Sequence, residues 1–400
     1  MTALRRPKLF LKLNLQVIGA CIFALFICGG AFSSTAFAQD PTYLAEYKLY
    51  SAALQDGDDT ATARHARNAW QAAEQELGDH QTTGVLAFNY GQFALFTNTR
   101  DAGEALRRAN QLRTLGISEL PAATLQMMIA FVDFDLGGMK RKHADALRQA
   151  LQTYETQNGE PSAYSAIIWG RLAGADLADR KYDLAKASAA RAEAAIRAAM
   201  PHNYQRKAEA IMIGAIATIV PSSRTGASIR NAYLDFVRAR VLFPPQKDID
   251  SFAPLLAQIL AWEGAARAAV ESQIFNSRLG RTSGKGESTP LEFRLLPKPN
   301  FTFTSGKSER ECGIELIQVE AEFPDNAVGR NMIGAALIGF HLDKNGKVTD
   351  ARVMADVPTG VYGGVSLEAV KQWRTKSPPP NEPACLQNHM ALLSFVVHIL

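Results

Sequence analysis

The chain has 400 residues, of which 47% are hydrophobic and 20% are charged. This composition excludes a disordered chain and a protein with many membrane spans, and the length predicts two folded units. The formal net charge is +4, and it is carried entirely by four basic residues near the start, which are Arg5, Arg6, Lys8 and Lys12. Because the rest of the chain is neutral, we expect no nucleic-acid partner.

The first 38 residues have the pattern of a secretory signal peptide. The basic residues precede an apolar run over residues 17–28, and residues 36–38, Ala-Phe-Ala, form a small-x-small cleavage site. We therefore expect cleavage before Gln39 and a mature protein in the periplasm. An alternative stays open, because residues 13–32 are long enough to span a bilayer if uncleaved. They would then anchor the chain in the inner membrane, with the rest of it periplasmic.

Residues 39–280 are predicted to form successive amphipathic helices separated by Gly and Pro residues. The segments between these breaks pair into helical hairpins that would bury a continuous apolar seam. The clearest hairpin resembles the tetratricopeptide repeat at five positions, which are Trp169, Leu172, Tyr182, Ala185 and Ala192. It departs from that repeat because Gly174 falls one residue late and the spacing of hairpins, near 40 residues, exceeds the usual length of about 34.

Residues 281–311 mix Gly, Ser, Thr and Pro with charges, and they predict a linker with one extended piece at residues 291–296. Beyond the leader, Cys312 and Cys385 are the two cysteines of the sequence. Two cysteines in an exported protein predict one disulfide, with two buried thiols that never meet as the alternative. Closing a loop of this length, about 73 residues, would stabilise the fold by up to roughly 4 kcal/mol.

Residues 312–400 predict a small domain that contains a β-hairpin. Asn345-Gly346 favours a type I′ turn, which requires positive φ at both central residues. The register that follows places four pairs on one largely apolar face: Leu342 with Thr349, Phe340 with Ala351, Ile338 with Val353, and Ala336 with Ala355. On the other face His341 is expected to pair with Asp350.

A short helix with Ala369, Val370 and Trp373 on one side is expected to cover the apolar face of this hairpin. Residues 392–400 then supply a last strand. The chain as a whole is therefore predicted to be an α+β protein of two domains. An all-α half of helical hairpins at residues 39–280 precedes a small antiparallel sheet at residues 312–400.

The C-terminal pattern resembles the C-terminal domain of the TonB family. The resemblance covers residues 312–400, about a quarter of the mature protein. Its elements are Phe323-Pro324, Ala327, the Asn345-Gly346 hairpin, Arg352-Val353, Ser366, Ala369, Val370, Trp373-Arg374, a proline-rich loop and a closing apolar strand.

This resemblance implies a periplasmic domain that captures a short segment of an outer-membrane transporter. The segment is added as a strand to the edge of the sheet, where unpaired N–H and C=O groups are available. The edge residues in this chain would be Leu392, Leu393, Ser394, Phe395, Val396, Val397, His398 and Ile399. The alternative is an edge covered by the helical half or by a second copy in a homodimer.

The sequence departs from the energy-transducing members of the family. Those members have a membrane anchor with a Ser and a His on one helix face, followed by a long proline-rich spacer. This chain has no His before His65 and has helical hairpins in place of the spacer. Glu320 also stands where the best-known members carry Gln in the transporter-contacting segment. The resemblance therefore favours peptide docking in transmembrane transport over proton coupling.

Two functional hypotheses follow. In the first, the chain is a TonB-like protein with a helical-repeat adaptor, and it binds a segment of an outer-membrane transporter or of another envelope protein. In the second, the helical half is a scaffold for protein partners, and the TonB-like domain only docks or dimerises. We expect no enzymatic activity, cofactor or metal, because the seven histidines are scattered and the sequence has no nucleophile elbow.

Overall fold

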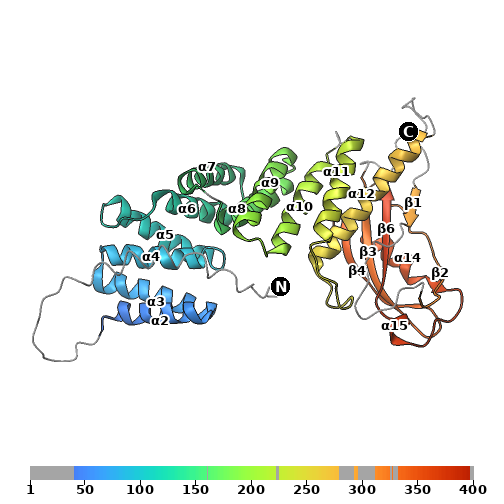
Figure 1. The fold of residues 1–400 in the computed structure, drawn as a ribbon, viewed down its shortest axis with the longest axis horizontal. Helices are drawn as coiled ribbons and strands as arrows, with labels where there is room; N and C mark the ends of the chain where they lie inside the picture. Colours follow the sequence, from blue (N-terminus) through green and yellow to red (C-terminus); the bar gives the residue numbers. More distant parts are fainter. Residues whose placement is uncertain are drawn as a thin grey trace, which may run out of the picture. The chain divides into compact units, whose positions relative to one another are not determined.

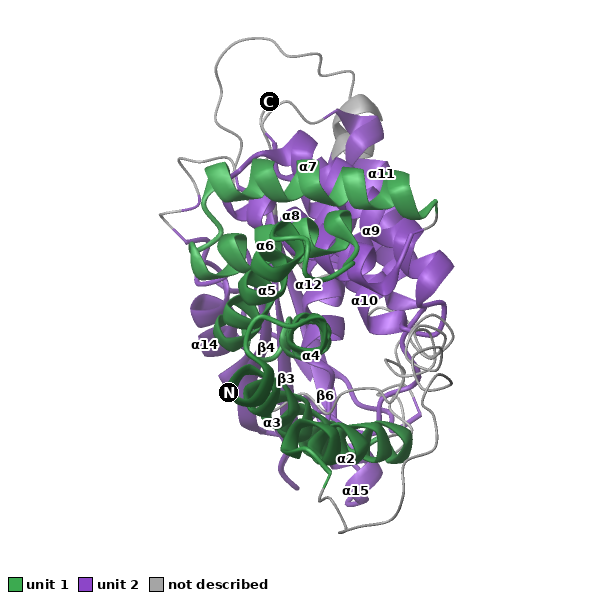
Figure 2. Ribbon diagram, turned by 90° about the vertical axis from the view of Figure 1, so that its left-hand side faces the viewer, with its two compact units in different colours: residues 1–160 green, residues 161–400 purple. Residues whose placement is uncertain are grey.

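A computed structural model (Figure 1) describes residues 40–159, 161–221, 225–278, 292–295, 311–324, 327 and 332–396. The predicted signal peptide and most of the predicted linker lie outside these residues. The chain divides into two compact units, residues 1–160 and residues 161–400, shown in different colours in Figure 2. Among the helices that are described, none has the length and apolar character needed to cross a membrane.

The described part of the first unit is helical, and each helix packs against the next. Its elements are α2 (Thr42–Asp56), α3 (Asp59–Leu77), α4 (Gln81–Ala94), α5 (Thr99–Thr114), α6 (Ala122–Leu136) and α7 (Arg141–Asn158). The local sequence explains where one helix ends and the next begins. Gly57 ends α2 with a φ of 71°, and the Asp58 carboxylate then accepts the backbone N–H groups of Thr60 and Ala61 to begin α3.

Five helices of the second unit continue this pattern: α8 (Ala163–Ala178), α9 (Tyr182–Ala199), α10 (Tyr204–Ile219), α11 (Gly226–Arg240) and α12 (Pro254–Arg278). The hairpin that was predicted most clearly is formed by α8 and α9. Of its marker residues, Trp169, Leu172, Ala185 and Ala192 are buried and Tyr182 is half-buried. The prediction of helical hairpins is therefore confirmed.

The second unit also contains an antiparallel sheet of four strands in the order β1-β6-β3-β4. The strands are β1 (Glu292–Leu295), β3 (Gly334–Leu342), β4 (Val348–Val357) and β6 (His389–Val396). A small second sheet pairs β2 (Leu316–Ile317) with β5 (Arg374–Thr375), and two short helices are α14 (Gly363–Lys371) and α15 (Pro383–Leu386). The α+β prediction is confirmed, and the extended piece expected at residues 291–296 is β1.

One face of the sheet packs against α12, which lies beside β3, β4 and β6 in Figure 1. Leu337, Val357 and Leu392 of the sheet belong to the same hydrophobic cluster as Leu256 and Trp262 of α12. Helix α12 and the sheet therefore share one core within the unit of residues 161–400.

The other face packs against α14 and the residues that follow it. Phe340 and Phe395 of the sheet contact Tyr362, Val370 and Trp373, and all five are buried. The indole N–H of Trp373 donates to a backbone carbonyl at 2.9 Å, which satisfies its polar group in the core. The predicted covering helix is confirmed.

The hairpin turn differs from the prediction. Asp343 and Lys347 close a loop of three residues, and of these Gly346 has a positive φ, 78°. The Asp343 carboxylate accepts the N–H groups of Asn345 and Lys347, each at 2.8 Å. These bonds favour a type I turn followed by a left-handed glycine over the predicted type I′ turn.

The register changes with the turn. Leu342 pairs with Val348 and not with Thr349. The irregularity between Gly339 and His341 then restores the predicted pairing of Ile338 with Val353. The predicted pair of Phe340 with Ala351 is wrong, because Phe340 lies at this irregularity. The predicted pair of Ala336 with Ala355 is also wrong, because a β-bulge between Leu337 and Ile338 shifts the register again and Ala336 pairs with Asp356.

The predicted disulfide is present. Cys312 and Cys385 are bonded, with their Cα atoms 5.7 Å apart, and both residues are buried. The bond ties the segment before β2 to α15.

Candidate functional site

The predicted partner-binding strand is part of the core. Leu392 is 4% exposed and packs toward α12, while Leu393 and Phe395 are fully buried on the opposite face. Phe395 stacks on Tyr362 with ring centroids 4.5 Å apart. The side chains of β6 therefore pack into the hydrophobic clusters on both faces of the sheet. The remaining predicted residues Val397, His398 and Ile399 lie outside the described residues.

The prediction that β6 has a free edge is wrong over Leu393–Val396. These residues pair with β1 in antiparallel register, with Glu292 opposite Val396 and Leu295 opposite Leu393. The physical reason is that an unpaired edge leaves backbone donors and acceptors without partners, and the chain's own extended segment satisfies them. A partner strand would have to replace β1 along these four residues.

With β1 in place the edge strands of the sheet are β1 and β4, and β4 is a poor acceptor of a further strand. The pairing of β4 with β3 has two irregularities, and Asp350 has a positive φ of 49°. At its start, the Val348 N–H already donates to the Trp373 carbonyl. Bulges of this kind are a common means of blocking edge-to-edge pairing.

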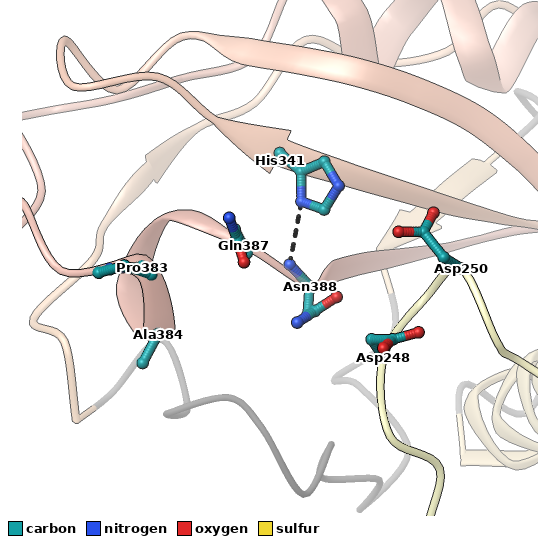
Figure 3. Close-up of a pocket in the computed structure, with 7 residues that line it drawn as sticks. All are labelled: Asp248, Asp250, His341, Pro383, Ala384, Gln387 and Asn388. Atoms are coloured by element: carbon teal, nitrogen blue, oxygen red, sulfur yellow. Dashed lines mark hydrogen bonds between the residues drawn. The ribbon is translucent and has the colours of Figure 1, made fainter.

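A pocket of about 290 Å³ lies where the loop between α11 and α12 meets the sheet (Figure 3). Its lining residues are Asp248, Asp250, His341, Pro383, Ala384, Gln387 and Asn388. The Asp248 carboxylate accepts the hydroxyl and the N–H of Ser251, and these bonds, the hydroxyl first, hold the pKa of Asp248 below its ordinary range. Asp250 pairs with Arg352 at 2.7 Å.

The polar atoms of this pocket fasten the loop to the sheet. The Asn388 side-chain oxygen accepts the Ile249 N–H at 3.2 Å, and Arg352 donates to the Ile249 carbonyl at 2.8 Å. The Asn388 N–H donates to the His341 Nδ1 at 3.2 Å, as Figure 3 shows. His341 therefore contacts Asn388 in place of its predicted partner Asp350, because the register shift places Thr349 opposite it.

These contacts give the pocket a structural role. Within the part of the chain that the structure describes, no group of three or more His, Cys, Asp or Glu residues is arranged to hold a metal ion. We find no arrangement in this pocket that favours catalysis.

A different surface stands out on the helices of the second unit. Arg171 of α8 and Arg206 of α10 lie close enough for their charges to interact, although they are 35 residues apart in the sequence. Arg171 is exposed and Arg206 is half-buried. Burial lowers the pKa of Arg206, the charge of Glu209 opposes this shift, and the charge of Arg171 adds a smaller lowering. The sequence analysis missed this pair, because only the packing of α8 on α10 brings the two residues together.

Comparison with known proteins gives a partial likeness. No protein-family model matches the chain, and no curated protein matches it. The structure of the MamA protein is 14% identical with a TM-score of 0.33, and the match covers 51% of this chain and 93% of that one. A signal transduction ATPase with a tetratricopeptide repeat sensor, from Pyrococcus horikoshii, is 14% identical with a TM-score of 0.39. That match covers 61% of this chain and 39% of the ATPase, so this chain spans well under two thirds of its length.

Proposed function

We propose that the chain is a helical-repeat scaffold that binds a protein partner through its helices, and that it is not an enzyme. The observation that carries this proposal is that both faces of the sheet are covered and that β6 is an interior strand. The two faces pack against α12 and α14, and β1 pairs with the strand that was expected to receive a partner. The sheet thus covers α12, the last helix of the helical array, which would otherwise expose a large apolar surface.

The helices leave more surface for a partner than the sheet does. In α8 and α10, exposed or half-buried residues recur on one side, among them Arg171, Ala178, Gln205 and Glu209. Successive helices of a repeat array present such residues side by side, which suits an extended or helical segment of a partner.

We place this scaffold in the periplasm, exported by the leader at residues 1–38. This part of the proposal rests on the basic residues, the apolar run and the cleavage site of the sequence. The TonB-like reading of residues 312–400, with an outer-membrane transporter segment or a second copy of the chain added to β6, requires that β1 leave its place. Proton coupling does not belong to the proposal, because the sequence has no His before His65.

Site-specific photo-crosslinking in intact cells tests the proposal. A photoreactive amino acid would replace Ala178 or Gln205 on the helices, and, as matched positions on the sheet domain, Thr349 or Val353, which are also exposed. We expect discrete crosslinked protein partners from the helical positions and none from the sheet positions. Crosslinks to a protein partner from Thr349 or Val353 alone would show that the sheet domain carries the binding surface and would overturn the proposal.

A further inference from the structure

The pocket beside the loop between α11 and α12 contains polar groups that the fastening contacts do not use. Those contacts engage the side-chain oxygen of Asn388, the guanidinium of Arg352 and one ring nitrogen of His341. Among the described residues, the other ring nitrogen of His341 and the side-chain amide of Gln387 take part in no hydrogen bond. Both residues line the pocket in Figure 3, so these groups are available to a bound molecule.

The hydrogen bond to Asn388 determines what His341 presents to the pocket. The Asn388 N–H donates to Nδ1 of His341 at 3.2 Å, so Nδ1 must carry a lone pair. The neutral imidazole therefore carries its hydrogen on Nε2. In Figure 3 this second nitrogen points away from Asn388, toward the side of the pocket where Asp250 lies. His341 thus presents a hydrogen-bond donor.

The loop side of the pocket presents acceptors, the carboxylates of Asp248 and Asp250. Asp248 is held by Ser251, and Asp250 pairs with Arg352 at 2.7 Å, which compensates its charge. A carboxylate has about four lone-pair sites, so both side chains can accept further hydrogen bonds.

The donor and the acceptors of the pocket do not meet each other. His341 forms no ion pair with Asp248 or Asp250 within 4.0 Å, although all three residues line the same cavity. A molecule bound between them has to accept a hydrogen bond from the imidazole and donate one to a carboxylate. A hydroxyl group does both, whereas an ammonium group only donates and a carboxylate or phosphate group only accepts.

The size and the remaining wall of the pocket narrow the ligand further. Pro383 and Ala384 are apolar, and they suit the C–H groups of a sugar ring. The volume of about 290 Å³ lies at the lower end of the range for small-molecule sites, about 300–1,000 Å³. It therefore suits a single ring better than a longer molecule.

We propose that this pocket binds a neutral sugar unit, whose hydroxyl groups bridge Nε2–H of His341 and the carboxylates of Asp248 and Asp250. The amide of Gln387 supplies a further donor and acceptor at the rim. This inference goes beyond the scaffold function and does not depend on it, because the pocket lies beside the sheet and not on α8 and α10.

Saturation-transfer difference NMR on the full mature chain tests the inference. The probes are glucose, galactose, mannose and N-acetylglucosamine, each titrated separately. The test variant is His341→Asn, because its amide oxygen can replace Nδ1 as the acceptor of the Asn388 N–H while the Nε2 donor is lost. The control is His202→Asn, at an exposed histidine between α9 and α10. We expect wild type and control to bind at least one probe equally, and the test variant to bind it about tenfold more weakly.

Hydrogen exchange of the Asn388 amide shows whether His341→Asn keeps the local structure. Unchanged protection assigns the weaker binding to the lost Nε2 donor. If protection falls, the comparison moves to Gln387→Ala, whose side chain is exposed and makes no hydrogen bond among the described residues. That variant should keep the protection of wild type and bind the sugar about threefold more weakly.

Three results would overturn the inference. The first is that none of the four neutral sugars binds saturably to wild type. The second is that both pocket variants bind as well as His202→Asn. The third is that glucosamine or glucuronate, which carry an ammonium or a carboxylate group, binds more tightly than glucose, because the pocket would then select a charge and not a hydroxyl group.

Discussion

Gly264 of α12 lies directly against Leu392 of β6. A Cβ atom built on Gly264 would be 2.6 Å from Cδ2 of Leu392 and 3.0 Å from its Cγ. Both residues are buried, so the leucine has little room to move away. The absence of a side chain at position 264 is thus what allows the helix to reach the sheet at this point.

The first prediction concerns this contact. Gly264→Ala should lower the free energy of unfolding by about 1–3 kcal/mol, because the added methyl group overpacks the joint between α12 and β6. The control is Gly214→Ala in α10, where the nearest atom would be Ala189 Cβ at an ordinary 3.6 Å. There we expect a gain of about 0.5–1 kcal/mol from the better helix former. Urea unfolding measures the free energy of unfolding of both variants. Equal changes would show that α12 and β6 are not tightly packed at Gly264.

Some of this arrangement could be read from the sequence. The alternation of apolar residues predicted the hairpin of α8 and α9, and the stripe of Ala369, Val370 and Trp373 predicted the cover of one sheet face. The sequence also carried a sign that α12 is buried and could cover the second face of the sheet, but this sign was not used. Between Pro254 and Arg278 the apolar residues run around the whole helix, which is typical of a helix buried on all sides.

Other features depend on contacts between distant residues. The extended piece at residues 291–296 was predicted, but nothing local in the sequence shows that it pairs with β6, a hundred residues later. The hairpin register was predicted from Asn345-Gly346 alone, and the Asp343 side chain changed the turn. For the same reason the pair of Arg171 and Arg206 could not be found before the fold was known.

The second prediction concerns the disulfide. Thiol titration of the denatured, unreduced mature protein should detect almost no free thiol, whereas two reactive thiols per chain would refute the bond between Cys312 and Cys385. Reduction should lower the free energy of unfolding by up to about 4 kcal/mol, because the cross-link closes a long loop in the unfolded chain. A variant with both cysteines replaced by alanine serves as the control, since its stability should not respond to the reductant.

The third prediction concerns pH and the hairpin turn. The N–H of Lys347, followed by that of Asn345, holds the pKa of Asp343 below its ordinary value. A lowered pKa in the folded state stabilises the fold above the unfolded value, near 3.9, and this contribution is lost as the pH falls through the folded value.

Asp343→Asn keeps an oxygen acceptor but removes the charge, and Asp343→Ala removes both. We expect wild type to be more stable than Asp343→Asn at pH 7 and the two urea midpoints to converge as the pH approaches 2. Asp343→Ala should stay less stable than both at every pH. A constant difference between wild type and Asp343→Asn would contradict the assignment.

The fourth prediction concerns the loop between α11 and α12. Asn388→Ala removes the acceptor of the Ile249 N–H and places a residue less suited to a φ of 62° at that position. We expect a loss of about 1–3 kcal/mol, because a backbone donor near the core loses its partner and positive φ is strained for alanine. Asn388→Asp keeps an oxygen acceptor and tolerates this conformation, so it should cost much less. Similar losses in the two variants would show that this bond does not fasten the loop.

The pairing of β1 with β6 decides whether the sheet can accept a partner strand at β6. Native-state hydrogen exchange of the full mature chain tests this directly at the amides of Leu393 to Val396 that point away from β3. We predict strong protection of these amides in wild type and its loss in the variant Phe293→Pro with Arg294→Pro. Because successive N–H groups of a strand point to opposite sides, one of the two prolines must remove a bond to β6. Rapid exchange of the same amides in wild type would mean that the edge is open, and it would return the strand-addition hypothesis to first place.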